Sequence, residues 1–453
     1  MLRALLSWSP RSPRVEGLVA LGAYALAYAV RARDLDASGL LGDAVGPWLA
    51  ASASPFNLHA HAPPYGWGLH PPYALSMLFA DSLRQAVANL LGLHALEAPV
   101  AALLAGRLGG VLPAITAGAL VALDGGLLDT ARSGSEAYLA ALWVGVMVLC
   151  GSKERFSVLA GPAWAMASMN HPLALATAPL LALGGRRALP GALVGALMLA
   201  PQLPRWWSEA PTPSEADAVL VPALSAWLRQ GGGSAYFLLL APLIGALRAR
   251  TRRLALGTLL AGLLLSVAGW KLGYLRDHHL RLLTIPAAAC AAALPGPTAL
   301  LPLLLLRWPA SELPEPGHPH RPGTLGLTTE ITAKIAALPP PVLVDGAWIS
   351  GTPAAEPGAV MLDLWLRGQR GLGPGGSVAV IVSYERGDEP PFEPKLSRGD
   401  RYFIASDGLD SLASALCGHA RLGGAYNGLA ALRPELGLEA ASGWRAACPE
   451  ESP

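Results

Sequence analysis

The sequence contains little charge and few cysteines. Only 14% of its 453 residues are charged, against about 25% in ordinary soluble domains. The net charge of +2 is too small to indicate binding to nucleic acid. Four cysteines are too few for a disulfide-rich secreted fold, although a bridge between Cys417 and Cys448 stays open if their segment is in an oxidising compartment. These deficits direct attention to the apolar residues.

Apolar sequence is plentiful and is organised in long runs. Hydrophobic residues make up 53% of the chain, and the mean hydropathy is +0.41. Apolar runs recur between residues 15 and 308, and several are long enough to cross a bilayer as helices. We therefore expect an α-helical polytopic membrane protein, with residues 1–311 as its membrane part.

The composition changes after the last apolar run. Residues 312–325 are rich in proline and form an expected linker. Strand-like runs such as "SVAVIVSY" then alternate with helix-like runs such as "AVMLDLWLRGQ". This alternation predicts a soluble α/β domain over residues 326–453.

Arginine placement predicts the orientation of the chain. Basic clusters occur at the N-terminus, at Arg186 and Arg187, and over residues 248–253. The positive-inside rule places all three clusters in the cytoplasm. The first loop, residues 32–84, and the C-terminal domain then lie outside the cytoplasmic (inner) membrane of a bacterial cell. Arg31 and Arg33 depart from this rule, and we expect Asp34 and Asp36 to neutralise them.

The number of spans depends on two long runs. Residues 85–123 can turn back at "GRLGG", and residues 156–184 can turn back at "MNHP". If both runs are hairpins there are about eleven spans, which we favour, and if both are single helices there are nine. Both counts are odd, so the C-terminal domain is outside in either case.

The first external loop holds the earliest candidate residues. Asp43 begins a helix-like run in "GDAVGPW", where it is either a carboxylate base at the membrane surface or a helix N-cap. The stretch "HAHAPPYGWGLHPPY" follows, with His61 and Tyr65. Its three histidines, His59, His61 and His70, are candidate metal ligands, although the prolines oppose the regular strand that would place His59 and His61 on one face. Its aromatics, including Tyr73, otherwise predict an interfacial belt at headgroup depth.

Later segments add acids and cations. Glu136 precedes an apolar helix, where it is a functional acid or a cap that interacts with the helix dipole. His171 breaks a helix within the membrane part, where polar groups are costly and usually functional. The densest cluster predicts either an interfacial anchor or an anion site suited to a lipid phosphate. It contains Lys271, Tyr274, Arg276, His278, His279 and Arg281.

Taken together, these motifs resemble the C-type polyprenyl-phosphate-dependent glycosyltransferases. The likeness covers roughly residues 15–300 and is strongest to the group of the protein O-mannosyltransferases and the aminoarabinose transferase of lipid A. It implies that Asp43 is the catalytic acid of the first loop and that Glu136 is the second external acid. It also implies that His61 and Tyr65, His171 and the late cluster bind sugar or lipid phosphate.

The implied reaction moves a sugar from a polyprenyl-phosphate donor to an external protein, lipid or glycan. A phosphate leaves as an anion, so the site needs a base for the acceptor hydroxyl and cations for the phosphate. No cofactor is indicated, while use of a divalent metal stays open. Two alternatives from other classes are a polytopic transporter and a membrane-anchored binding or assembly factor that acts through its C-terminal domain.

Overall fold

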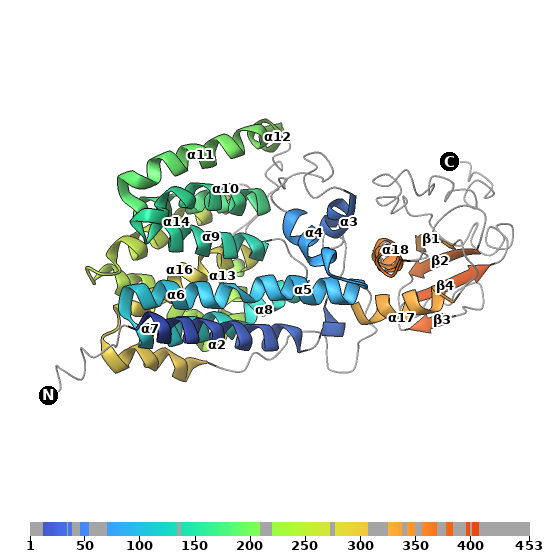
Figure 1. Cartoon of the computed structure of the whole chain (residues 1–453), viewed down its shortest axis with the longest axis horizontal. Helices are drawn as coiled ribbons and strands as arrows, with labels where there is room; N and C mark the ends of the chain where they lie inside the picture. Colours follow the sequence, from blue (N-terminus) through green and yellow to red (C-terminus); the bar gives the residue numbers. More distant parts are fainter. Residues whose placement is uncertain are drawn as a thin grey trace.

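The computed structural model describes most of the apolar part and several segments of the C-terminal part. The described residues are 12–33, 35–38, 46–53, 70–133, 137–208, 220–271, 277–306, 325–337, 342–348, 356–368, 377–383, 396–398 and 401–406. They are mostly helical, and the helices form an elongated bundle with a small sheet near one end (Figure 1).

The first half of the bundle begins with a capped helix. Ser12 accepts a hydrogen bond from the Val15 N–H at 3.5 Å, and Pro13 occupies the first turn, where its missing N–H costs nothing. The elements of this half are α2 (Pro13–Ala32), η1 (Leu35–Ala37), α3 (Gly46–Ala53), α4 (His70–Leu78), α5 (Leu83–Ala95), α6 (Glu97–Gly109), α7 (Val111–Ala122), α8 (Gly125–Ser133) and α9 (Ala137–Gly151).

The second half continues the bundle and leads to the sheet. Its helices are η4 (Glu154–Leu159), α10 (Ala160–Asn170), η5 (Pro172–Ala188), α11 (Leu189–Leu199), η6 (Ala200–Gln202), α12 (Leu203–Ser208), α13 (Leu220–Ala246), α14 (Arg252–Lys271), α15 (Asp277–Leu280), η7 (Arg281–Leu283), α16 (Thr284–Ala289), η8 (Cys290–Ala293) and η9 (Gly296–Leu305). The C-terminal elements are α17 (Leu325–Ile335), β1 (Val342–Trp348), α18 (Glu356–Leu366), β2 (Ser377–Ser383), β3 (Leu396–Arg398) and β4 (Arg401–Ser406).

Both expected hairpins are present. Gly110, with φ of 93°, separates α6 from α7, and Gly118 of α7 lies against Ala98 and Ala102 of α6. At the second turn, His171 has extended backbone, and η5 runs back along α10 so that Gly184 lies beside Ser157. A positive φ disfavours residues with a Cβ, which explains why glycine stands at the first turn.

A third reversal brings α11 against α10. Gly185, with φ of 57°, turns the chain between η5 and α11. A Cβ added at Gly195 would lie 2.4 Å from the Gly161 carbonyl oxygen, so the two backbones are in direct contact. The outer face of α11 is apolar and exposed, with Leu193 63% and Leu197 64% accessible. This helix therefore presents its glycines to the bundle and its leucines to the surroundings.

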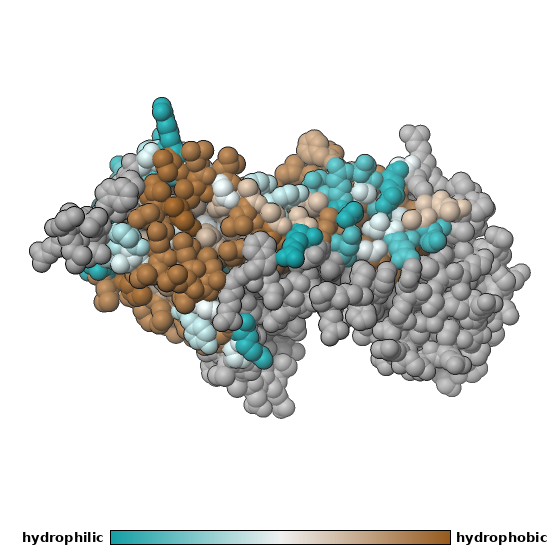
Figure 2. Space-filling view, turned by 90° about the horizontal axis from the view of Figure 1, so that it is seen from below, coloured by the Kyte–Doolittle hydropathy of each residue, from teal (hydrophilic) through white to brown (hydrophobic). Residues whose placement is uncertain are grey.

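Helix length and composition are compatible with membrane association. Four helical stretches are long and apolar enough to cross a bilayer, namely 13–32, 83–109, 172–202 and 252–269. Five shorter apolar helices of 10–17 residues accompany them, and the stretch 172–202 contains the Gly185 reversal. These lengths do not support eleven full crossings among the described residues. On the face drawn in Figure 2, apolar residues cover much of the described part of the bundle.

One end of the bundle collects basic residues. Arg107 donates hydrogen bonds to the Leu149 carbonyl at 2.9 Å and to Ser152. Nearby, Arg187 forms an ion pair with Glu154. Lys153 belongs to the same end, where the positive charge of Arg107 lowers the pKa of its ammonium. The start of α2 lies at this end too, because the Glu16 side chain is close to Gly106 of α6. A Cβ added at Gly106 would lie 3.3 Å from it.

The C-terminal elements lie at the opposite end (Figure 1). The sheet has the order β1-β2-β4-β3, with β1 parallel to β2 and the other two pairs antiparallel. The Leu325 N–H of α17 donates to the Ser38 carbonyl at 2.8 Å. Buried Asp363 of α18 accepts the Leu83 N–H at 2.7 Å, at the first turn of α5. These hydrogen bonds are among the contacts that attach this part of the chain to the bundle.

The expected neutralisation of Arg31 by Asp36 is wrong, and Asp34 lies outside the described residues. Arg31 forms an ion pair with Glu97, whereas Asp36 pairs with Arg84. Arg31 lies in the last turn of α2, and its helix faces α6, so its side chain is directed into the bundle and away from the loop.

Candidate functional site

The structure describes some of the predicted site residues with their side chains, some as backbone alone and some not at all. Asp43, His61, Tyr65, Glu136, Tyr274 and Arg276 lie outside the described residues, as do Cys417 and Cys448. Lys271 ends α14 and His278 belongs to α15, but only their backbones are described. His171, His279 and Arg281 are described with their side chains.

Two of the predicted residues are in contact. The imidazole rings of His171 and His279 lie 4.6 Å apart between centroids and are tilted by 45°. Both side chains are buried. His171 caps η5, where its Nδ1 accepts the Leu173 N–H at 3.3 Å. That acceptor role leaves the ring proton of neutral His171 on Nε2. The helix break at "NHP" and the late basic cluster therefore meet in one place.

Arg281 is held by a carboxylate that the sequence reasoning did not select. Its Nη1 donates to both oxygens of Asp124, at 2.9 and 3.1 Å, and its Nη2 donates to the Trp227 carbonyl at 3.2 Å. The guanidinium also lies 5.3 Å from the Trp227 ring. A Cβ at Gly126 would lie 1.8 Å from Nη2, so only glycine leaves room for this side chain. The ion pair fixes η7 against the start of α8.

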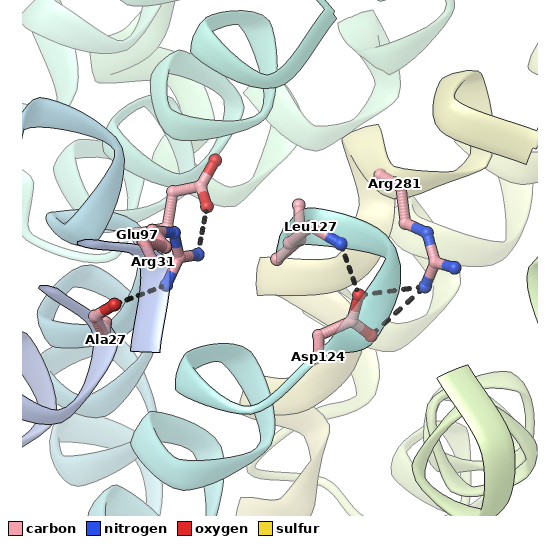
Figure 3. Close-up of polar contacts among 6 residues, drawn as sticks. All are labelled: Ala27, Arg31, Glu97, Asp124, Leu127 and Arg281. Carbon is pink, nitrogen blue, oxygen red and sulfur yellow. Dashed lines mark hydrogen bonds and ion pairs between the residues drawn. The ribbon is translucent and has the colours of Figure 1, made fainter. Parts of the chain in front are cut away.

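Asp124 serves two partners at once. Besides Arg281, its Oδ1 accepts the Leu127 N–H at 2.8 Å, which satisfies an amide of the first turn of α8. Figure 3 shows both contacts converging on the carboxylate. Asp124 and Arg281 are each at most 1% exposed. The charges compensate each other, so Arg281 contributes to the position of the late segment and adds little net charge.

A second buried ion pair joins α2 to α6. Arg31 Nη2 donates to Glu97 Oε2 at 2.9 Å, and both side chains are 1% exposed. Arg31 also donates to the Ala27 carbonyl (Figure 3). Within the described part of the chain, the other Glu97 oxygen accepts no hydrogen bond.

The sequence did carry a signal for these missed residues. Glu97 and Asp124 are isolated acids within or beside apolar runs, and Arg31 ends the first one. Ionisable residues at such places are expensive to bury and are usually paired or functional. The signal identifies the residues but not which of them pair with each other, because Arg31 and Glu97 are 66 positions apart in the sequence.

The expected headgroup position of Tyr73 is wrong. Tyr73 is fully buried and packs edge-on against Trp48, with ring centroids 4.8 Å apart. This contact joins α4 to α3, because an aromatic pair in this geometry is favourable inside a core. His70, at the start of α4, is buried too. The described residues contain no group of three metal-ligating side chains, and His61 lies outside them.

The described site is therefore a buried histidine pair whose His279 lies two residues before Arg281 of the Asp124–Arg281 ion pair. It can donate hydrogen bonds from imidazole and is positioned by compensated charges. No protein-family model matches the chain, and no curated protein matches it in sequence.

Proposed function

We propose that the protein is a membrane glycosyltransferase that moves a sugar from a polyprenyl-phosphate donor to an extracytoplasmic acceptor. The contact between His171 and His279 carries this proposal. The sequence predicts that both residues bind sugar or lipid phosphate, and they come from separate helices that meet at one place. Imidazole N–H groups in a buried setting are suitable donors to phosphate oxygens.

In this mechanism the residues have separate tasks. Asp43 takes the proton of the acceptor hydroxyl as the hydroxyl oxygen attacks the sugar carbon. The bond between that carbon and the oxygen of the phosphate then breaks. The phosphate leaves as an anion and is stabilised by His171, His279 and the neighbouring late cluster. The Asp124–Arg281 pair holds η7, and hence His279, in place. Glu136, His61 and Tyr65 complete the external face of the proposed site.

The proposal includes a topology. Basic residues gather at the end of the bundle where α2 starts, and the C-terminal elements lie at the other end. This distribution supports a cytoplasmic basic end and an external C-terminal α/β domain in a bacterial inner membrane. The hairpins at Gly110 and His171 are the two turns on which a count near eleven depends, and the helices of 10–17 residues would cross only where the bilayer is locally thinned.

The assay uses the full-length protein in liposomes with a radiolabelled polyprenyl-phosphate sugar and a mixture of envelope acceptors. We expect Asp43→Asn to lower transfer by about 10²- to 10⁴-fold, the usual range for a general base. Asp36→Asn is the matched control, because Asp36 is an exposed acid of the same loop and pairs with Arg84 on the surface. Full activity of Asp43→Asn would overturn the mechanism.

A transporter is the second candidate, and the buried charges favour it. Arg31, Glu97, Asp124 and Arg281 form two ion pairs inside a bundle of apolar helices. Intramembrane charges often mark a substrate or proton path. In the same liposomes, solute- or proton-coupled flux that is lost in Glu97→Gln, together with absence of sugar transfer, would favour this reading.

A further inference from the structure

Two grooves flank one apolar ridge on the surface of the bundle. Leu75 of α4 and Leu93 of α5 line both grooves, together with Leu96, which links α5 to α6. The first groove holds about 490 Å³ and is bounded by α4, α5, α6, α9 and α10. The atoms that face the groove are apolar, and its lining residues include Pro71, Val146 and Met166.

The second groove is similar in size and has some polar character. It holds about 400 Å³ between α2, α4 and α5. Tyr24 and Tyr28 line it and are stacked, with ring centroids 6.3 Å apart and planes at 9°. Ser76 and Asn89 line it too, and the Asn89 amide donates to the Ser76 carbonyl at 2.9 Å. Apolar side chains make up the rest of the groove.

The grooves are continuous with the apolar surface of the bundle. Leu75 is 50% and Leu96 is 38% exposed, so the ridge belongs both to the grooves and to the surface that a bilayer would contact. Water is a poor occupant of an apolar groove, and an empty groove leaves its lining atoms without dispersion partners. A hydrocarbon chain from the bilayer would fill such a groove without burying polar groups and would give the lining atoms their dispersion contacts.

We propose that these grooves bind one two-chain phospholipid, with one acyl chain on each side of the ridge formed by Leu75, Leu93 and Leu96. Two grooves of similar volume that share a wall fit two chains joined at one glycerol. Tyr24 and Tyr28, near the end of α2 that leads to the external loop, lie where tyrosines contact lipid headgroups. A polyprenyl phosphate has a single chain and leaves one groove unoccupied. The site is thus separate from the proposed donor site and does not depend on transferase activity.

The test is native mass spectrometry of the full-length protein released from nanodiscs. Three nanodisc preparations differ in one added lipid, which is phosphatidylglycerol, its single-chain lyso form or a polyprenyl phosphate. We expect one phosphatidylglycerol to stay bound while the lyso form is lost under the same activation. Equal retention of the lyso form, or equal retention of the polyprenyl phosphate, would overturn the proposal.

Variants then assign the lipid to the grooves. Leu103→Trp fills the first groove, and Gly92→Leu fills the second, where an added Cβ meets the Tyr24 hydroxyl at 3.4 Å without a clash. Each is expected to lose the bound phosphatidylglycerol. Leu193→Trp on the exposed face of α11 is the control and should retain it. Retention by both groove variants contradicts the assignment. If a variant does not elute as a folded species, the wild-type comparison of one-chain and two-chain lipids still decides the question.

Discussion

Ion pairs inside the bundle and ion pairs on its surface have the same chemistry but different consequences. Arg31–Glu97 and Asp124–Arg281 join distant segments and are at most 1% exposed. Arg84–Asp36 has comparable distances, yet both side chains are about half exposed. Desolvation makes a buried pair expensive to form and very expensive to break, while solvent screens the surface pair. The interior charges therefore fix positions, and the exposed charges contribute little.

The largest expected effect comes from removing one member of a buried pair. Asp124→Ala leaves Arg281 charged without its partner and removes the acceptor for the Leu127 amide. We expect it to lower the free energy of unfolding by about 3–5 kcal/mol. Asp124→Asn keeps an oxygen for that amide and should lose less. Chemical unfolding in mixed micelles measures both, and a loss below about 1 kcal/mol for Asp124→Ala would contradict the argument.

A smaller change in stability is expected when one methyl group is added to a glycine in the interior and to a glycine on the surface. A Cβ at Gly161 would lie 1.8 Å from the Gly191 carbonyl oxygen, whereas one at Gly22 meets nothing within 4 Å. Gly161→Ala should separate α10 from α11 and cost about 1–3 kcal/mol. Gly22→Ala should stabilise α2 by about 0.5–1 kcal/mol. Thermal unfolding of the two variants in the same detergent tests the sign of the difference.

The smallest effect is expected at the surface pair. Arg84→Ala removes the partner of Asp36, which stays solvated. The loss should be below about 1 kcal/mol and should shrink further as salt increases. Unfolding measured at low and high ionic strength checks this, and a loss as large as that of Asp124→Ala at both salt concentrations would remove the distinction between interior and surface.

Local signals predicted the reversals of the chain. The glycines of "GRLGG" and the proline of "MNHP" interrupt helices for reasons internal to a few residues, and the structure turns at both places. His171 and His279, both predicted as ligand-binding residues, are in contact, while their role in binding stays a prediction. The predicted roles of Asp43 and Glu136 stay predictions.

Long-range pairing could not be predicted in the same way. Arg31 has two acids within five residues, yet it pairs with Glu97 because α2 packs on α6 and turns that side chain inward. Tyr73 looked like an interfacial aromatic from its neighbours, but α3 supplies Trp48 and encloses it. In both cases the outcome depends on which helices meet, and a single sequence without such contacts leaves that open.

The hydrogen bond from Leu83 to Asp363 has a consequence for how the chain can be divided. The amide belongs to the first turn of the 83–109 helix, and its acceptor comes from α18, beyond the proline-rich segment 312–325. Cutting the chain at that segment would leave the amide without its carboxylate and expose the apolar face of α18. The C-terminal part thus supplies the hydrogen-bond acceptor for the first amide of the 83–109 helix, and protein engineers who wish to express the bundle alone need to replace that carboxylate.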